Sequence, residues 1–278
     1  MKALFDKVSA ECSKLTTRTY STSFSLGIHF LHKKLHEPIY AIYGFVRFAD
    51  EVVDTFHHYD KETLLADFRA ETFRAIETGI SLNPILNSFQ RTVNEYHIEH
   101  ELIDIFLKSM EMDLARPSHD SMSFQNYIFG SAEVVGLMCL WVFCNGDRQF
   151  YESLKGPAMR LGAAFQKVNF LRDLHYDYYD LSRTYFPGLD LENFTPEKKL
   201  AIENDIDEDF RYAVEGIKRL PKGTRFGVYV AYVYYRALLE KIKRSSGETL
   251  LQSRLRVPTH QKFKLLIYSI LRYNLGLL

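Results

Sequence analysis

The chain has 278 residues, of which 46% are hydrophobic and 25% charged, so it can form one large or two small soluble domains with a sizeable core. Its formal net charge of +0 excludes recruitment of nucleic acid by bulk charge. The 3 cysteines, Cys12, Cys139 and Cys144, are too few and too dispersed for a disulfide framework or a zinc site, and we expect them to be reduced.

Helical patterns dominate the chain. The segment 36–56 has Pro38 near its first turn and apolar residues at helical spacing. The next helix, over 60–79, has Asp60 as a plausible N-cap and Gly79 as its stop. Further helices are predicted over 83–96, 100–115, 123–145, 150–180, 195–219, 225–246 and 259–275.

Neither alternating strands, nor a repeat, nor a long linker interrupts this pattern. We therefore predict a single all-α domain over 1–278, a helical bundle around a central apolar cavity. The first residues lack the apolar core of a signal peptide, and the most apolar run, Val134–Cys144, is about half of what a bilayer requires. We expect a cytoplasmic protein, and peripheral contact with a membrane is compatible with this.

Two pairs of aspartates stand four residues apart. Asp50 and Asp54 lie in "RFADEVVD", and Asp173 and Asp177 lie in "FQKVNFLRDLHYD". Four residues apart, like charges share a helix face and destabilise the helix by a few tenths of a kcal/mol. Such a repulsion calls for a compensating partner.

The second pair continues into a longer polar stripe. Gln166 and Asn169 lie on the same face as Asp173 and Asp177, with apolar residues on the flanks. Hard oxygen ligands in this number suit Mg²⁺, which is normally shared with substrate phosphates, and nearby arginines suit phosphate oxygens. The pattern predicts a clamp for a diphosphate between two helices; for either pair alone, a solvated helix face is the plainer interpretation.

Other metal and nucleotide sites fit less well. A di-iron bundle needs Glu-x-x-His twice, and the chain has one near match, Asp54 to His57. The segment "HIEHE", His97–Glu101, is better explained as a solvated helix end. The P-loop, GxGxxG and GxSxG patterns are absent.

Seven landmarks in chain order carry a family resemblance. The chain resembles the squalene/phytoene synthases, which join two prenyl diphosphates head to head, over nearly its whole length. The landmarks are "STSF" (21–24), "AIYGFVRFADEVVD" (41–54), "MEMDL" (110–114), "YIFGSAEVVG" (127–136), "LGAAFQKVNFLRDLHYD" (161–177), "SRTYFP" (182–187) and "RVP" (256–258).

The resemblance implies a fold of the isoprenoid synthase type and a role for each matching residue. Two or three Mg²⁺ ions would be held by Asp50, Asp54, Asn169, Asp173 and Asp177. The substrate diphosphates would be bound by Ser21, Arg47, Arg172 and Arg256. The residues near the reacting carbons would be Tyr43, Tyr127, Gln166, Tyr185 and Tyr234. For each tyrosine, core packing is the plainer alternative.

Three positions depart from the family pattern. Glu133 stands where a small residue is usual, and could cap a donor or narrow the pocket. The segment between Asp177 and "SRTYFP" is one residue longer than usual, and Ser182 replaces a glycine. Glu51 replaces an aspartate, and we expect it to lie off the metal.

The resemblance implies a prenyltransferase in carotenoid biosynthesis. The expected reaction joins two geranylgeranyl diphosphates through a cyclopropyl (prephytoene) diphosphate to phytoene, releasing diphosphate and using no NADPH. The first alternative is a C30 enzyme that makes dehydrosqualene, or squalene with NADPH, from farnesyl diphosphate. The second is a non-catalytic helical relative with an assembly role, which would be expected to lose its acidic pairs. Ile28 and Tyr40 are candidates for closing the pocket and setting chain length.

Overall fold

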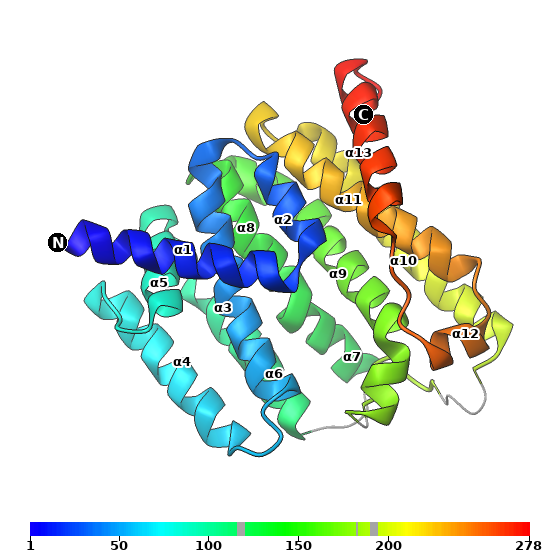
Figure 1. Ribbon diagram of the computed structural model, residues 1–278, viewed down its shortest axis with the longest axis horizontal. Coiled ribbons are helices and arrows are strands. Elements are labelled where there is room, and N and C mark those ends of the chain that lie inside the picture. Colours follow the sequence, from blue (N-terminus) through cyan, green and yellow to red (C-terminus); the bar gives the residue numbers. More distant parts are fainter. Residues whose placement is uncertain (116–119, 182, 190–193) are drawn as a thin grey trace.

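The structure, a computed structural model, describes residues 1–115, 120–181, 183–189 and 194–278. The described residues form helices and no β-strand, which confirms the predicted all-α class (Figure 1). In chain order they are α1 (Lys2–Tyr20), α2 (Thr22–His29), η1 (Lys33–Leu35), α3 (His36–Asp54), α4 (Lys61–Thr78), α5 (Pro84–Tyr96), α6 (His100–Ala115), α7 (Ser121–Ile128), η2 (Phe129–Glu133), α8 (Val134–Cys144), α9 (Arg148–Tyr179), α10 (Pro196–Arg219), α11 (Lys222–Lys243), α12 (Gly247–Gln252) and α13 (Thr259–Asn274).

The residues predicted to begin and end the early helices are confirmed. Asp60 caps α4 by accepting a hydrogen bond from the Thr63 amide at 3.0 Å. Gly79 ends the same helix at φ +72°, a left-handed conformation that glycine adopts without the steric cost of a Cβ. Pro38 lies in the first turn of α3.

Two helices, α1 and α2, precede the first predicted one. Apolar periodicity does not reveal α1, because the buried side of this helix consists of small and polar residues: Ser9, Ala10, Ser13 and Thr17. Their size lets α1 approach α3 closely. A Cβ placed on Gly44 of α3 would lie 3.2 Å from the Ser13 side chain.

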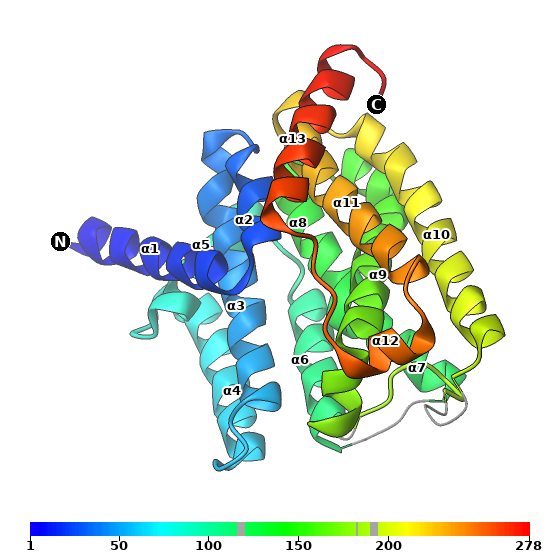
Figure 2. The same cartoon turned by 45° about the vertical axis from the view of Figure 1, so that its right-hand side comes forward.

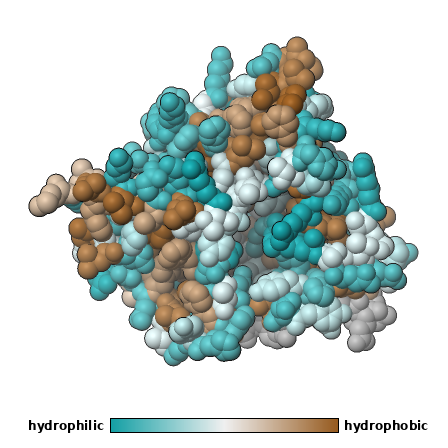
Figure 3. Space-filling model, viewed as in Figure 1, coloured by the Kyte–Doolittle hydropathy of each residue, from teal (hydrophilic) through white to brown (hydrophobic). Residues whose placement is uncertain are grey.

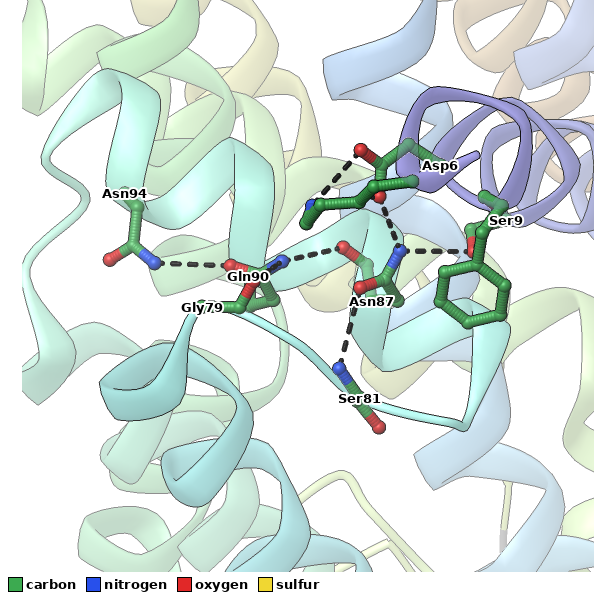
Figure 4. A network of polar contacts seen from close by, with 9 residues as sticks. Asp6, Ser9, Gly79, Ser81, Asn87, Gln90 and Asn94 are labelled. Carbon is green, nitrogen blue, oxygen red and sulfur yellow. Dashed lines mark hydrogen bonds and ion pairs between the residues drawn. The ribbon is translucent and has the colours of Figure 1, made fainter.

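A polar network fixes α1 on the rest of the protein (Figure 4). Asn87 of α5 is fully buried, and its amide donates to Asp6 and to Ser9, both at 3.1 Å. The same Asn87 side chain accepts a hydrogen bond from the Ser81 amide at 3.3 Å. A buried amide with all these partners orients α1, which contributes through its end at Tyr20 to the cavity described below.

The longest helix, α9, runs through the middle of the molecule (Figures 1 and 2). It packs against α8 and η2 on one side and against α10 and α11 on the other. The helices α1, α3, α4 and α5 form the other part of the bundle, and α3 joins the two parts by packing on α8. The aspartates of α3 and α9 therefore belong to helices of two different packing layers. The single domain over 1–278 stays a prediction.

The predicted helix over 123–145 contains a π-helical segment, η2, between α7 and α8. Taken together, Ser121–Cys144 is long and apolar enough to cross a membrane by length and composition, longer than the run noted from the sequence. Within this stretch, 67% of the most apolar window is buried inside the protein. Burial of that extent is typical of a core helix.

Candidate active site

A cavity of about 400 Å³ lies between α2, α3, α8, α9, α10 and α11. Most of its wall is apolar, with side chains such as Ile42, Val135 and Leu161. The wall becomes polar where α3 meets α9. There it is lined by the predicted site residues Ser21, Tyr43, Arg47, Asp50, Gln166, Asn169 and Arg172.

The first acidic pair is at the end of α3. Burial, followed by repulsion from Asp54, raises the pKa of Asp50 to about 8. Asp54 accepts a hydrogen bond from Arg183 Nη1 at 2.7 Å. Glu51 pairs with Arg47, whose guanidinium also lies 4.2 Å from the centre of the Tyr20 ring. The position of Glu51 away from a metal stays a prediction.

The second acidic pair is near the end of α9. Asp173 accepts hydrogen bonds from Arg172 Nε at 3.0 Å and pairs with Arg254 Nε at 2.6 Å. Asp177 is buried, and its pKa is raised to about 8 by burial and then by repulsion from Asp173 and Asp54. Because the charge of Asp54 on α3 raises the pKa of Asp177 on α9, the two acidic pairs face one another.

The donor chemistry of these carboxylates suits Mg²⁺. In the described part of the chain, no three His, Cys, Asp or Glu side chains are close enough to enclose an ion alone. Mg²⁺ commonly uses only one or two carboxylates, with phosphates and water supplying its other ligands. The pKa values of Asp50 and Asp177 are raised chiefly by burial and further by repulsion from the neighbouring aspartates, and a bound cation would relieve both effects.

A third carboxylate, Asp113 of α6, lies beside the acidic pairs and was not predicted. Tyr127 donates to its Oδ2 at 2.6 Å, and Tyr185 donates to its Oδ1 at 3.4 Å. Burial raises the pKa of Asp113 to about 7. Tyr127 and Tyr185 thus belong to a buried network next to the cavity and do not line it. The only sequence signal for Asp113 was its place in "MEMDL".

Arg183 connects this network to α3 and was also not predicted. Its guanidinium donates to Asp54, to the Val53 carbonyl at 3.1 Å and to Tyr185 at 3.3 Å. Arg183 is buried and lies within the "SRTYFP" landmark, although no role was predicted for it. Ser182, singled out above, lies outside the described residues. Through its bonds to Asp54 and Val53, Arg183 fixes its own segment to the end of α3.

Neighbouring tyrosines of α11 point to different places. Tyr235 lines the cavity, donates to Asn169 Oδ1 at 3.3 Å and stacks on Phe165 at 4.0 Å. Tyr234, the predicted residue, points away from the cavity and donates to the Lys262 carbonyl at 2.9 Å. Successive residues of a helix are about 100° apart, and "VYVAYVYYR" is apolar all round, so the sequence could not fix the rotation of this helix.

A similar offset separates Arg254 from Arg256. Arg254 pairs with Asp173 and lines the cavity, whereas the predicted Arg256 is exposed and absent from the lining. The backbone carbonyl of Arg256 accepts a hydrogen bond from Lys241 at 2.7 Å. Both residues lie in the segment between α12 and α13, where there is no helical periodicity from which the direction of a side chain could be predicted.

The π-helical segment η2 brings backbone close to α9. A Cβ placed on Gly162 would lie 2.6 Å from the Ala132 carbonyl oxygen, so only glycine permits this approach. Glu133 follows Ala132 but does not line the cavity. Burial raises its pKa, and the positive charge of Arg160 opposes that shift. Of the two candidates for closing the pocket, Ile28 lines the cavity and Tyr40 does not.

Comparison with known proteins agrees with this geometry. The sequence pattern of the family described as "Squalene/phytoene synthase" matches residues 17–261. The chain belongs to the squalene/phytoene synthase family. It is 28% identical to a phytoene synthase from Arthrospira platensis over 95% of this chain and 93% of that one. It is 27% identical to a presqualene diphosphate synthase from Zymomonas mobilis, over 86% of each chain.

The fold of this squalene/phytoene synthase family member also matches a solved structure. A dehydrosqualene synthase crystal structure superimposes with a TM-score of 0.81 at 18% identity, covering 97% of this chain and 98% of that chain. The superposition confirms the predicted isoprenoid synthase type of helical bundle. At this identity the likeness concerns the fold alone.

Proposed function

We propose that the protein joins two allylic prenyl diphosphates head to head, with release of diphosphate, as a prenyltransferase of carotenoid biosynthesis. The observation that carries this proposal is the pair of facing acidic helices at the polar end of an apolar cavity. Charged groups on Arg47, Arg172 and Arg254 suit the diphosphate, and the apolar wall suits two prenyl chains.

Mg²⁺ would be held by Asp50, Asp54, Asn169, Asp173 and Asp177, and when bound it supplies positive charge that stabilises the departing diphosphate. The arginines near these residues donate to the phosphate oxygens as the C1–O bond breaks and its electron pair leaves with the diphosphate. Ser21 and Tyr43, which also line the cavity, add hydroxyl donors at the same end.

The apolar wall then keeps water from the allylic cation. The C2=C3 double bond of the second substrate attacks C1 of the cation, and loss of a proton gives a cyclopropyl diphosphate. Phe165 and Tyr235 present aromatic faces that stabilise a cation by about 0.5–2 kcal/mol each without acting as nucleophiles. Gln166 lies within the same wall, where its amide orients the reacting carbons.

Ionisation of the cyclopropyl intermediate and rearrangement give the 1–1′ linkage. Loss of a proton then completes phytoene, without a reductant. We propose two geranylgeranyl diphosphates as substrates and phytoene as product, which the Arthrospira platensis relative supports along nearly the full length of both chains. The Zymomonas mobilis relative favours the second candidate, a C30 reaction on farnesyl diphosphate.

A product assay tests the proposal. The protein is incubated with Mg²⁺ and with each prenyl diphosphate separately, with and without NADPH, and the extracted hydrocarbons are analysed by mass. The expected product is a C40 hydrocarbon, formed in the same yield with and without NADPH. A C30 product alone would overturn the chain-length assignment, and absence of any hydrocarbon would favour a non-catalytic assembly role.

A further inference from the structure

The helix α13 exposes an apolar stripe on the outside of the protein. Phe263, Ile267 and Leu271 of α13 and Leu275 directly after it recur every four residues, and their exposed fractions are 63%, 45%, 56% and 70%. Figure 3 shows an apolar area at the upper right, where α13 lies in Figure 1. A helix that packs on one side normally presents polar residues on the other.

The opposite face of α13 already has its packing partner. Leu265 contacts the small apolar cluster formed by Ile217, Tyr229 and Val233, and Ser269 is fully buried. The stripe therefore faces away from the core of the bundle. Large contiguous apolar surface of this kind marks an interaction site.

The charge around α13 has one sign. From Thr249 to Leu278 the sequence has neither Asp nor Glu, and its basic residues are Arg254, Arg256, Lys262, Lys264 and Arg272. Since the whole chain has a net charge of +0, the rest of the molecule is acidic. In the described residues, Lys262 and Arg272 make hydrogen bonds to Thr22 and Tyr268, and neither pairs with a carboxylate.

The same end of the molecule carries a second group of exposed cations. The His32 amide donates to the Gly223 carbonyl at 2.7 Å, which brings the turn before η1 against the start of α11. Both turns and the last part of α13 lie at the top of Figures 1 and 2. The exposed cations here, which we call the basic rim, are Lys33, Lys34, Lys218, Arg219 and Lys222, of which Lys218 pairs with the exposed Glu215.

The apolar end of the cavity lies directly beneath this rim. Leu31 and Leu220 line the cavity and are buried, and each is within two residues of a rim cation. The acidic pairs lie at the far end of α3, where the cavity is polar. The cavity thus extends from the polar site toward the end that carries the stripe and the rim.

We propose that the α13 stripe and the basic rim dock on the surface of an anionic lipid bilayer, with α13 lying in the interface. Apolar side chains of an amphipathic helix enter the boundary between headgroups and acyl chains, while cations attract anionic headgroups. A second copy of the chain fits this face poorly, because pairing it with itself would bring the basic rims together. The proposal stands independently of the reaction, although an apolar product would benefit from release at that end.

The helix α1 supplies a control for α13. It also exposes apolar residues, Leu4 and Leu15, each 67% exposed. It carries four basic and two acidic residues, and Lys2 and Lys14 pair with Asp6 and Glu11. The free end of α1 lies on the other side of the molecule from α13 (Figure 1), so substitutions there test exposed apolar residues outside the proposed docking face.

Sedimentation with vesicles tests the proposal without substrate or turnover. The full chain is mixed with vesicles of phosphatidylcholine alone or with half phosphatidylglycerol, at low and high salt. We expect binding to the anionic vesicles that weakens in high salt. Phe263→Ser with Leu271→Ser should lower the partition coefficient by at least about tenfold, whereas Leu4→Ser with Leu15→Ser should leave it unchanged.

A rim variant and a measurement of mass complete the test. Lys33→Gln with Lys34→Gln should lower binding by about 25-fold and flatten its salt dependence, since each cation near the surface contributes about fivefold. Circular dichroism checks that every variant is folded. Equal loss in the α1 and α13 variants, or no binding by the unaltered protein, overturns the proposal. Light scattering measures the mass of each variant in solution. If the unaltered protein is a dimer and only the α13 variant is a monomer, the stripe binds a second copy of the chain and the proposal is wrong.

Discussion

The two acidic pairs share a sequence spacing and differ in how the protein holds them. On α3 the outer carboxylate, Asp54, is paired with Arg183, while Asp50, nearer the helix start, has a pKa raised to about 8. On α9 the order is reversed: Asp173, nearer the helix start, is paired with arginines, and Asp177 has a pKa raised to about 8.

This difference separates the roles of the two carboxylates within each motif. Neither Asp50 nor Asp177 makes an ion pair within the described ranges of the chain, so their oxygens are available for a cation bound with a substrate. Asp54 and Asp173, the other two proposed Mg²⁺ ligands among the aspartates, also bind arginines, and through Asp173 two of them, Arg172 and Arg254, are fixed near the cavity. Each helix thus contributes one carboxylate that we assign to the cation alone and one that also binds arginine.

Of all the substitutions, those of Asp50 and Asp177 should lower turnover the most. We expect Asp50→Asn and Asp177→Asn each to lower turnover by about a thousandfold, because stabilisation of the leaving group is lost. Without Mg²⁺ both variants should unfold at a higher temperature than the unaltered protein, since a repelled, desolvated carboxylate is removed. Product formation and thermal unfolding measure the two effects.

Asp180 supplies the control for these variants. It is exposed at the end of α9, one turn from Asp177, and outside the cavity lining. Asp180→Asn should keep turnover within about twofold, as surface substitutions usually do. If Asp50→Asn and Asp180→Asn behaved alike, the separation of tasks between the carboxylates would be wrong.

Replacing the arginines that bind Asp54 and Asp173 should lower the stability of the protein by different amounts. Arg183 is buried and bonded to α3, so we expect Arg183→Gln to lower the free energy of unfolding by about 2–3 kcal/mol. Arg254 has a half-exposed side chain, and Arg254→Gln should cost less than about 1 kcal/mol while still slowing turnover. Urea unfolding of both variants checks the order; a reversed order would contradict the described role of Arg183.

The stability of the metal-free protein should fall as the pH rises from about 4 to about 8. Asp50 and Asp177 bind protons up to a pKa of about 8 in the folded state, against about 3.9 in an unfolded chain. The folded state therefore binds more protons between these values, and the free energy of unfolding decreases with pH until about 8. Thermal unfolding in EDTA measures this slope.

Substitution and metal then test the origin of the slope. Asp50→Asn with Asp177→Asn should flatten it, and saturating Mg²⁺ should do the same for the unaltered protein by binding the deprotonated carboxylates. A slope that persisted in the double variant would assign the effect to other groups, of which Asp113 is the first candidate.

The smallest predicted effects distinguish the two tyrosines of α11. Tyr235→Phe removes the hydrogen bond to Asn169 at the cavity and should lower turnover by about fivefold. Tyr234→Phe removes the bond to the Lys262 carbonyl and should cost about 1 kcal/mol of stability with turnover unchanged. Steady-state rates and urea unfolding separate the two; equal rate losses would contradict the assignment of Tyr235 to the cavity.

Much of the site was predictable because it lies on regular helices. The spacing of Asp50, Asp54, Asp173 and Asp177 places each pair on one face, whatever the rest of the fold does. Asn169 and Gln166 follow from the same periodicity. Asp113 and Arg183 could not be found this way, since each is joined to the site by contacts between segments far apart in the chain.

The sequence by itself determined the helical class, the two acidic faces and the family, because local periodicity and ordered motifs need no knowledge of packing. Tertiary structure alone decided which carboxylate of each pair binds arginine and which has its pKa raised to about 8. It also selected Tyr235 over Tyr234 and Arg254 over Arg256. Those choices depend on how each helix is rotated against its neighbours, and desolvation and repulsion in the packed protein then fix the charge of every group.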